Sequence, residues 1–186
     1  MHPTRTSAND PPGPPHPHPA AFDDARLLKD CRLGKGRSGG PGGQHRNKVE
    51  TTVFITHLPT GTESHAAERR SAEENRKAAV FRLRLALATD VRCALPPGDA
   101  WGDARSALWR VRCRDGKIAC NPEHRDFPSL LAEALDTLHA CGLDEHKAAL
   151  RLECTPSQLI RFVREHAPAM SWWNRGRAAA GKHPLK

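Results

Sequence analysis

A glycine-rich stretch near residue 40 holds the residues of this sequence that are best suited to chemistry. It runs from Ser38 to Gln44 as SGGPGGQ and is followed by His45, Arg46, Asn47 and Lys48. Two glycines directly before Gln44 allow backbone conformations that a Cβ forbids, and they keep the tip of the segment thin. A glutamine on such a tip offers a backbone N–H for a developing oxyanion and a neutral amide that can orient water. The stretch can therefore carry a neutral amide on a thin tip.

Cations flank this stretch, with Arg37 before it and Arg46 and Lys48 after it. Such side chains favour contacts with nucleic-acid phosphates, which position a protein without reading sequence. Nucleotide binding is disfavoured, because the stretch lacks both the Lys-Ser/Thr ending of a P-loop and the GxGxxG spacing. An isolated Gly-Gly-Gln would be interpreted as a flexible connector, so the assignment depends on the residues around it.

The elements that must position this stretch are a hairpin and a helix. Residues 49–58 are β-branched and roughly alternating, 59–62 have turn chemistry, and 63–68 follow as a second strand. Ser71 and Glu74 form a capping-box pattern, which predicts a helix to about residue 88. A hairpin packed on one helix is a small α+β layer. The glycine-rich residues 33–44, in contrast, are predicted to form no regular element.

The second half of the sequence predicts a hairpin followed by helices. Strands over 109–113 and 117–120 flank an Asp115-Gly116 turn and could extend the first sheet. A helix beyond Pro128 is predicted to stop at Gly142, and Asp144 and Thr155 are predicted to cap two shorter helices. The expected organisation is α+β, with these parts: a disordered proline-rich arm over 1–21, a catalytic domain over 22–92, a linker over 93–107, and the hairpin with its helical extension and basic end over 108–186.

Composition narrows the class of partner. The 186 residues carry 29 Lys and Arg against 21 Asp and Glu, a net charge of +8 that favours a polyanion. No apolar run of about 18 residues or hydrophobic leader is visible, which predicts a cytoplasmic protein without a membrane partner. Six cysteines without a CxxC pair are interpreted as buried thiols, and His16 and His18 as part of a solvated tail. No metal or other cofactor is therefore expected.

The run from Ser38 to Thr51, together with Thr60-Gly61 and Arg70–Arg76, resembles the peptidyl-tRNA hydrolysis domain of class I bacterial and organellar peptide chain release factors. The resemblance covers about residues 24–88. It implies hydrolysis of the ester joining a nascent peptide to tRNA in the peptidyl transferase centre of the ribosome, where RNA supplies much of the surroundings. It implies Gly42, Gly43 and Gln44 as catalytic residues. With this interpretation, the residues predicted to contact RNA are Arg37, His45, Arg46, Asn47 and Lys48.

Full-length factors of this family also carry a codon-recognition domain, with a tripeptide loop of the PxT or SPF kind, and a long N-terminal helical region. Neither is found in this sequence. The expected activity is therefore codon-independent release from stalled ribosomes by a monomer, as in the short ribosome-rescue relatives. Those relatives often end in a long basic tail, whereas this sequence continues into capped helices and the pair Trp172-Trp173.

Alternatives remain for several residues and for the function. The segment from Asp144 to His166 has helix-turn-helix spacing, which makes Arg161 and Arg164 candidate RNA contacts; a helical hairpin that completes a core is the alternative. The tryptophan pair is interpreted as core anchors rather than base-stacking side chains. His45, His57 and His65 are interpreted as surface residues rather than bases. The competing functions are a non-catalytic ribosome- or RNA-binding quality-control factor and a DNA-binding protein that uses the helix pair.

Overall fold

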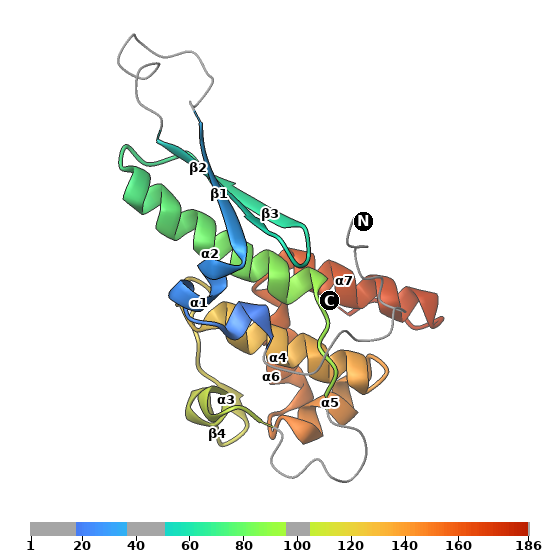
Figure 1. Ribbon diagram of the computed structural model, residues 1–186. Helices are drawn as coiled ribbons and strands as arrows, with labels where there is room; N and C mark the ends of the chain where they lie inside the picture. Colours follow the sequence, from blue (N-terminus) through green and yellow to red (C-terminus); the bar gives the residue numbers. More distant parts are fainter. Residues whose placement is uncertain (1–17, 37–50, 96–104, 186) are drawn as a thin grey trace.

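The computed structural model describes residues 18–36, 51–95 and 105–185, and it shows a mixed fold built on a small antiparallel sheet. Strands β1, β2 and β3 pair in sequence order, and one helix, α2, covers one face of the sheet (Figure 1). This confirms the predicted α+β class. The elements are η1 (Pro19–Ala21), α1 (Asp24–Lys29), β1 (Cys31–Gly36), β2 (Thr52–His57), β3 (Thr62–Ala66), α2 (Ala72–Asp90), α3 (Ala107–Arg112), β4 (Cys113–Arg114), β5 (Lys117–Ile118), α4 (Phe127–Ala140), α5 (Glu145–Arg151), α6 (Pro156–Arg164) and α7 (Ala167–Ala179).

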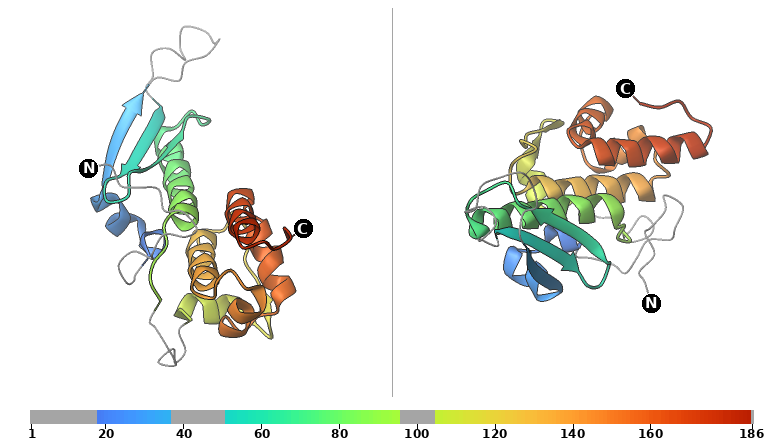
Figure 2. Two further views of the ribbon diagram at one scale, coloured as in Figure 1. Left: turned by 90° about the vertical axis from the view of Figure 1, so that its right-hand side faces the viewer. Right: turned by 90° about the horizontal axis from the view of Figure 1, so that it is seen from above.

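Helix α2 is the central support of the fold. The Ser71 hydroxyl accepts a hydrogen bond from the backbone N–H of Glu74, as the capping pattern predicts. One side of α2 packs on the sheet, where Val53, Ile55 and Ala66 are buried. Figure 2 shows α4 and α7 on the other side of α2, so this helix joins the sheet to the helical half of the molecule. In the described residues no helix is long and apolar enough to cross a bilayer.

The glycine-rich segment contains a strand that the sequence did not predict. Leu33 to Gly36 complete β1, which pairs antiparallel with β2 so that Gly34 faces Phe54 and Gly36 faces Thr52. A Cβ on Gly36 would lie 2.8 Å from the Phe54 ring, closer than real contacts allow. The expectation of an irregular segment from residue 33 is thus wrong for 33–36. Gly36 thus makes room for an aromatic ring on the neighbouring strand.

The predicted strand over 109–113 is wrong for residues 109–112. Residues 107–112 form α3, whose first turn is capped by the Ser106 hydroxyl, and only Cys113-Arg114 and Lys117-Ile118 pair around the Asp115-Gly116 turn. Trp109 is fully buried and its indole N–H donates to the carbonyl oxygen of Leu152 at 2.8 Å. This distant contact outweighs the β-propensity of the segment. The short hairpin forms a sheet of its own and does not extend the first one.

The predicted helix ends in the second half are confirmed. Gly142 follows α4 with φ 64°, and the side chains of Asp144 and Thr155 cap α5 and α6. Trp172 and Trp173 are buried in α7, which confirms them as core anchors. The indole N–H of Trp173 donates to the Leu143 carbonyl oxygen at 3.2 Å, so neither ring is available for base stacking.

The proline-rich arm ends earlier than predicted. Pro19–Ala21 form η1, and His18 is buried with its Nδ1 accepting a hydrogen bond from the Ala20 N–H. The expected disorder is therefore wrong for residues 18–21, and His18 is not part of a solvated tail; residues 1–17 lie outside the described part. Arg84 of α2 donates to the carbonyl oxygens of Ala20 and Phe22, which fastens this segment to the fold.

Candidate functional site

Two paired strands hold the ends of the segment that carries SGGPGGQ. Gly36 and Thr52 are the last pair of the β1–β2 ladder, so the chain leaves the sheet and returns to it at the same end of these two strands. Most of the predicted site residues lie between these ends, in 37–50, outside the described residues; they are Arg37, Gly42, Gly43, Gln44, His45, Arg46, Asn47 and Lys48. The structure thus describes the base from which these residues extend.

Asn75 ties the returning end of this segment to α2. Its side chain is fully buried, and its Nδ2 donates to the carbonyl oxygens of Thr51 at 2.7 Å and Arg69 at 2.9 Å. Its Oδ1 accepts a hydrogen bond from the Arg69 backbone N–H at 2.9 Å. Three of the four hydrogen-bonding sites of this amide are therefore used to fix backbone on either side of the β2–β3 hairpin. Asn75 acts as a positioning residue for Thr51.

Replacing Asn75 with alanine is expected to loosen this anchor. The substitution leaves two carbonyl oxygens and one N–H without their partner, which costs about 1–3 kcal/mol for each group that remains buried. Denaturant unfolding should show that loss, and peptide release should slow even though residues 37–50 are unchanged. Lys77→Ala, at an exposed position two residues further along α2, is the matched control and should alter neither quantity by much. Wild-type stability in Asn75→Ala would contradict the anchoring role.

The outer face of the sheet presents an aromatic side chain beside the base of the segment. Phe54 is 46% exposed, and its ring stacks on the His65 imidazole with centroids 5.8 Å apart. Cations surround this base: Arg32 and Lys35 on β1 are exposed, as is Arg76 on α2. Phe54, Arg32 and Lys35 were not singled out from the sequence. The alternation in β2, where exposed Phe54 lies between buried Val53 and Ile55, could have indicated Phe54.

Nucleophilic side chains in the described residues are not arranged for covalent catalysis. His57 is buried, not on the surface as expected, and its Nδ1 hydrogen-bonds the Thr60 hydroxyl at 2.8 Å; burial lowers its pKa. Burial raises the pKa of Cys93 and Cys154 to about 12 and that of Cys31 to about 11. Thiols with such pKa values stay protonated and are poor nucleophiles at neutral pH.

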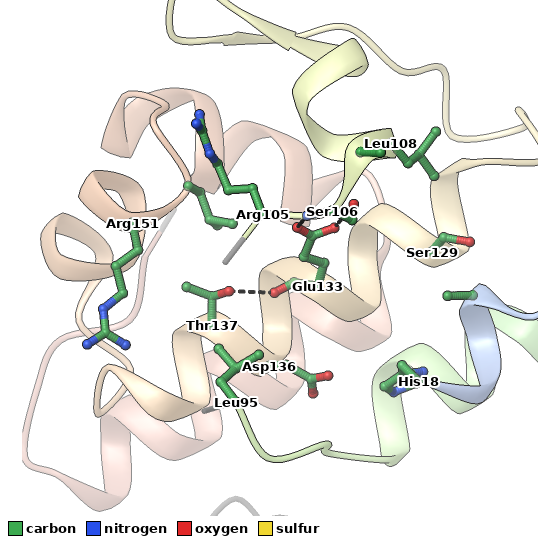
Figure 3. Close-up of a pocket in the computed structure, with 13 residues that line it drawn as sticks. His18, Leu95, Arg105, Ser106, Leu108, Ser129, Glu133, Asp136, Thr137 and Arg151 are labelled. Carbon is green, nitrogen blue, oxygen red and sulfur yellow. Dashed lines mark hydrogen bonds between the residues drawn. The ribbon is translucent and has the colours of Figure 1, made fainter. Parts of the chain in front are cut away.

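A cavity of about 500 Å³ lies in the helical half, between η1, α3 and α4 (Figure 3). Figure 3 shows His18 and Asp136 on one side of it and Arg105 and Arg151 on another. The donor atoms of His18, Cys93 and Asp136 lie within 4.8 Å of one another. We assign no metal to this group. His18 Nδ1 already accepts from a backbone N–H, and its Nε2 lies 3.2 Å from the Val91 carbonyl oxygen.

A buried ion pair lies next to this cavity. Arg92 and Asp136 are 2% and 1% exposed, and the Arg92 Nη1 donates to Asp136 Oδ1 at 3.1 Å. The same carboxylate oxygen accepts a hydrogen bond from the Cys93 backbone N–H, while Asp136 Oδ2 has no hydrogen-bond partner among the described residues. Burial raises the pKa of Asp136 to about 7, against the opposing charge of Arg92. Because Arg92 follows α2 and Asp136 belongs to α4, the pair fastens the sheet-bearing half to the helical half.

The two arginines predicted as RNA contacts on the C-terminal helix pair lie far from the base of the SGGPGGQ segment. Arg161 and Arg164 are exposed on α6, which packs against α4, α5 and α7. Figure 1 places α6 at the opposite end of the molecule from the β1–β2 edge that leads to residues 37–50. The predicted RNA contacts thus fall into two separate groups.

Comparison with known proteins agrees with the resemblance noted above. Residues 28–94 match the RF-1 domain. The chain is 32% identical to peptide chain release factor 1 of Chloroherpeton thalassium over 150 residues, which cover 81% of this chain and 39% of that protein. It is 45% identical to peptide chain release factor 1 of Acidiphilium cryptum over 71 residues, 38% of this chain and 20% of that protein. It is 38% identical to the chloroplastic peptide chain release factor PrfB1 of Arabidopsis thaliana over 89 residues, 47% of this chain and 20% of that protein. The chain therefore spans less than half the length of these relatives.

Proposed function

This chain belongs to the class I peptide chain release factor family, and from that premise we propose that it hydrolyses peptidyl-tRNA on the ribosome. The observation that supports this most strongly is the pairing of Gly36 with Thr52 at the base of the SGGPGGQ segment. Both ends of the segment are fixed in a sheet that is backed by α2 and tied down by Asn75. A reactive tip carried on so rigid a base can be delivered to one place in an RNA-lined cavity.

In this proposal Gln44 stands beside the ester carbon. Water adds to that carbon, and the backbone N–H of Gln44 donates to the oxyanion that develops. The carbon–oxygen bond to the tRNA ribose then breaks, and a proton from the attacking water ends on the ribose oxygen. The products are a tRNA with a free hydroxyl and a peptide carboxylic acid, which releases its proton to solvent at neutral pH. The side-chain amide of Gln44 orients the water and leaves no room for a larger nucleophile.

The remaining predicted site residues near Gln44 would hold RNA. Arg37, Arg46 and Lys48 would contact phosphates, and His45 and Asn47 sugars or phosphates, beside the exposed cations Arg32 and Lys35. The partners in this proposal are the ribosome and peptidyl-tRNA. The protein would act on them in the cytoplasm, as a monomer. Ribosomal RNA would complete the catalytic surroundings.

We further propose that release does not depend on a stop codon. These 186 residues contain neither a PxT nor an SPF tripeptide of the codon-reading kind. Peptide release should proceed at similar rates when the A site shows a stop codon, a sense codon or no codon, provided that mRNA does not block entry. The measurement is single-turnover release from three ribosome complexes that differ only in their mRNA.

Each outcome of that comparison has one meaning. Similar release from all three complexes supports codon-independent hydrolysis. Release that rises by orders of magnitude only with a stop codon would contradict codon independence but not hydrolysis. Stable binding without release from any complex would instead favour a non-catalytic quality-control factor.

A further inference from the structure

The helical unit at the C-terminal end orients one face of α6 toward solvent. Helices α4, α5 and α6 contact one another, and Glu153 with φ 49° makes the tight turn between α5 and α6. The centroid of the Phe162 ring lies 5.0 Å from that of Phe127 and 6.1 Å from that of Trp109. Leu159 and Val163 on the same helix are buried. Because these residues fix the inner face of α6, the opposite face is fixed as well.

The outer face of α6 is basic. Ser157, Arg161 and Arg164 occupy successive turns of this face, and all three are exposed. The two arginines have no ion-pair partner in the part of the chain that the structure describes. Other arginines of the helical unit are paired: Arg105 with Glu153, Arg112 with Asp126 and Arg177 with Glu145. The nearest acidic residue in sequence, Glu165, lies at the C-terminal end of the helix.

A second pair of cations lies next to the start of this helix. The carbonyl oxygen of Gly116, in the β4–β5 turn, accepts a hydrogen bond from the Thr155 N–H at 3.2 Å, so the hairpin tip sits at the α6 cap. Arg114 and Lys117 are direct partners in this hairpin, and both are exposed. Because like charges opposite each other destabilise a strand pair, this pairing of two cations does not serve the stability of the hairpin. Asp115 in the turn is the one acidic residue between Arg114 and Lys117, so the hairpin tip retains excess positive charge.

We propose that Arg114, Lys117, Arg161 and Arg164, together called the α6 surface, bind the phosphate backbone of base-paired RNA. The choice of RNA over DNA rests on the proposed function, which places the chain on the ribosome. Arginine and lysine bind phosphates without reading bases, and the deep, narrow major groove of an RNA helix does not admit side chains that would read them. The α6 surface is therefore a second RNA-docking region, separate from residues 37–50. It holds the protein on the ribosome and takes no part in hydrolysis.

The test measures binding of the full chain to a short RNA stem-loop over a range of salt concentrations. Each lost phosphate contact should reduce the slope of log affinity against log salt by about 0.7–0.9. Arg161→Gln/Arg164→Gln and Arg114→Gln/Lys117→Gln should each reduce it by about 1.5. The matched control is Arg175→Gln/Lys182→Gln, which removes the same charge from exposed residues of α7 and the segment after it. Figure 1 shows α7 on the far side of the helical unit from the hairpin.

The outcomes separate this proposal from the proposed function. Unchanged slopes in both surface variants, or an equal reduction in the control, would overturn the α6 surface. Stronger binding to a DNA duplex of the same sequence would overturn the assignment to RNA. In the release assay the surface variants should need more protein for half-maximal release while the rate at saturation stays the same. A wild-type chain that binds the stem-loop but releases no peptide would contradict the proposed function alone.

Discussion

Replacing Gln44 with proline is expected to lower the single-turnover rate of peptide release by roughly 10²- to 10³-fold, the effect of losing one preorganised oxyanion donor. Proline removes the backbone N–H, whereas alanine retains it, so Gln44→Ala should be much less harmful. Gly42→Ala or Gly43→Ala should lose most of the activity through backbone geometry. The measurement is release from ribosomes at saturating concentrations of each variant.

Ribosome binding supplies the control for these variants. Residues 42–44 are assigned to the chemical step, so the affinity of each variant for ribosomes should stay close to that of the wild type. Equal release rates for the wild type and Gln44→Pro would rule out the backbone N–H as the oxyanion donor. A large loss of binding would show instead that the segment serves chiefly for docking.

The second large effect is expected from the buried pair Arg92–Asp136. Removing one partner of such a pair typically costs about 3–5 kcal/mol of stability, because the other charge stays buried. The two partners should differ, since a carboxyl can take up a proton whereas a guanidinium remains charged. Asp136→Asn leaves Arg92 charged and buried against Trp172, with the guanidinium carbon 4.8 Å from the ring centroid. We therefore expect Asp136→Asn to destabilise the fold more than Arg92→Met.

The pH dependence of Arg92→Met gives an independent check. Burial raises the pKa of Asp136, and loss of the opposing charge of Arg92 raises it further. A carboxyl whose pKa is higher in the folded than in the unfolded chain binds a proton more tightly when folded. The contribution of this carboxyl to stability is therefore present at low pH. It is lost as the pH rises from the pKa of the unfolded chain, near 4, through the raised pKa of the folded chain. Denaturant unfolding at pH 5 and pH 8 should show Arg92→Met less stable at pH 8, relative to the double variant Arg92→Met/Asp136→Asn. Equal stability at both pH values would contradict a buried, raised Asp136.

Local rules predicted the parts of this fold that depend on neighbours in sequence. The cap of α2 at Ser71, the stop at Gly142 and the caps at Asp144 and Thr155 follow from side chains that bond backbone within a few residues. These features need no tertiary information, and the sequence pattern was sufficient to place them.

Distant contacts decided the parts that sequence patterns missed. Gly34 and Gly36 lie in a strand because β2 pairs with them, and the Phe54 ring occupies the space that a Cβ on Gly36 would need. Trp109 lies in a helix because its indole reaches the carbonyl of Leu152, 43 residues away. The roles of Asn75 and Asp136 likewise depend on partners that no local spacing indicates. For the candidate site, the SGGPGGQ motif predicted the residues of 37–50 from the sequence, and the structure adds the base that holds them.

The most direct test of this account is a single-turnover assay with wild-type protein and ribosomes that hold peptidyl-tRNA in the P site and nothing in the A site. Free peptide should appear at a rate that saturates with protein concentration, and tRNA with a free hydroxyl should appear in equal amount. Gln44→Pro should bind the same ribosomes and release little. Saturable binding of the wild type with no release of peptide would contradict the central claim that this chain is a peptidyl-tRNA hydrolase.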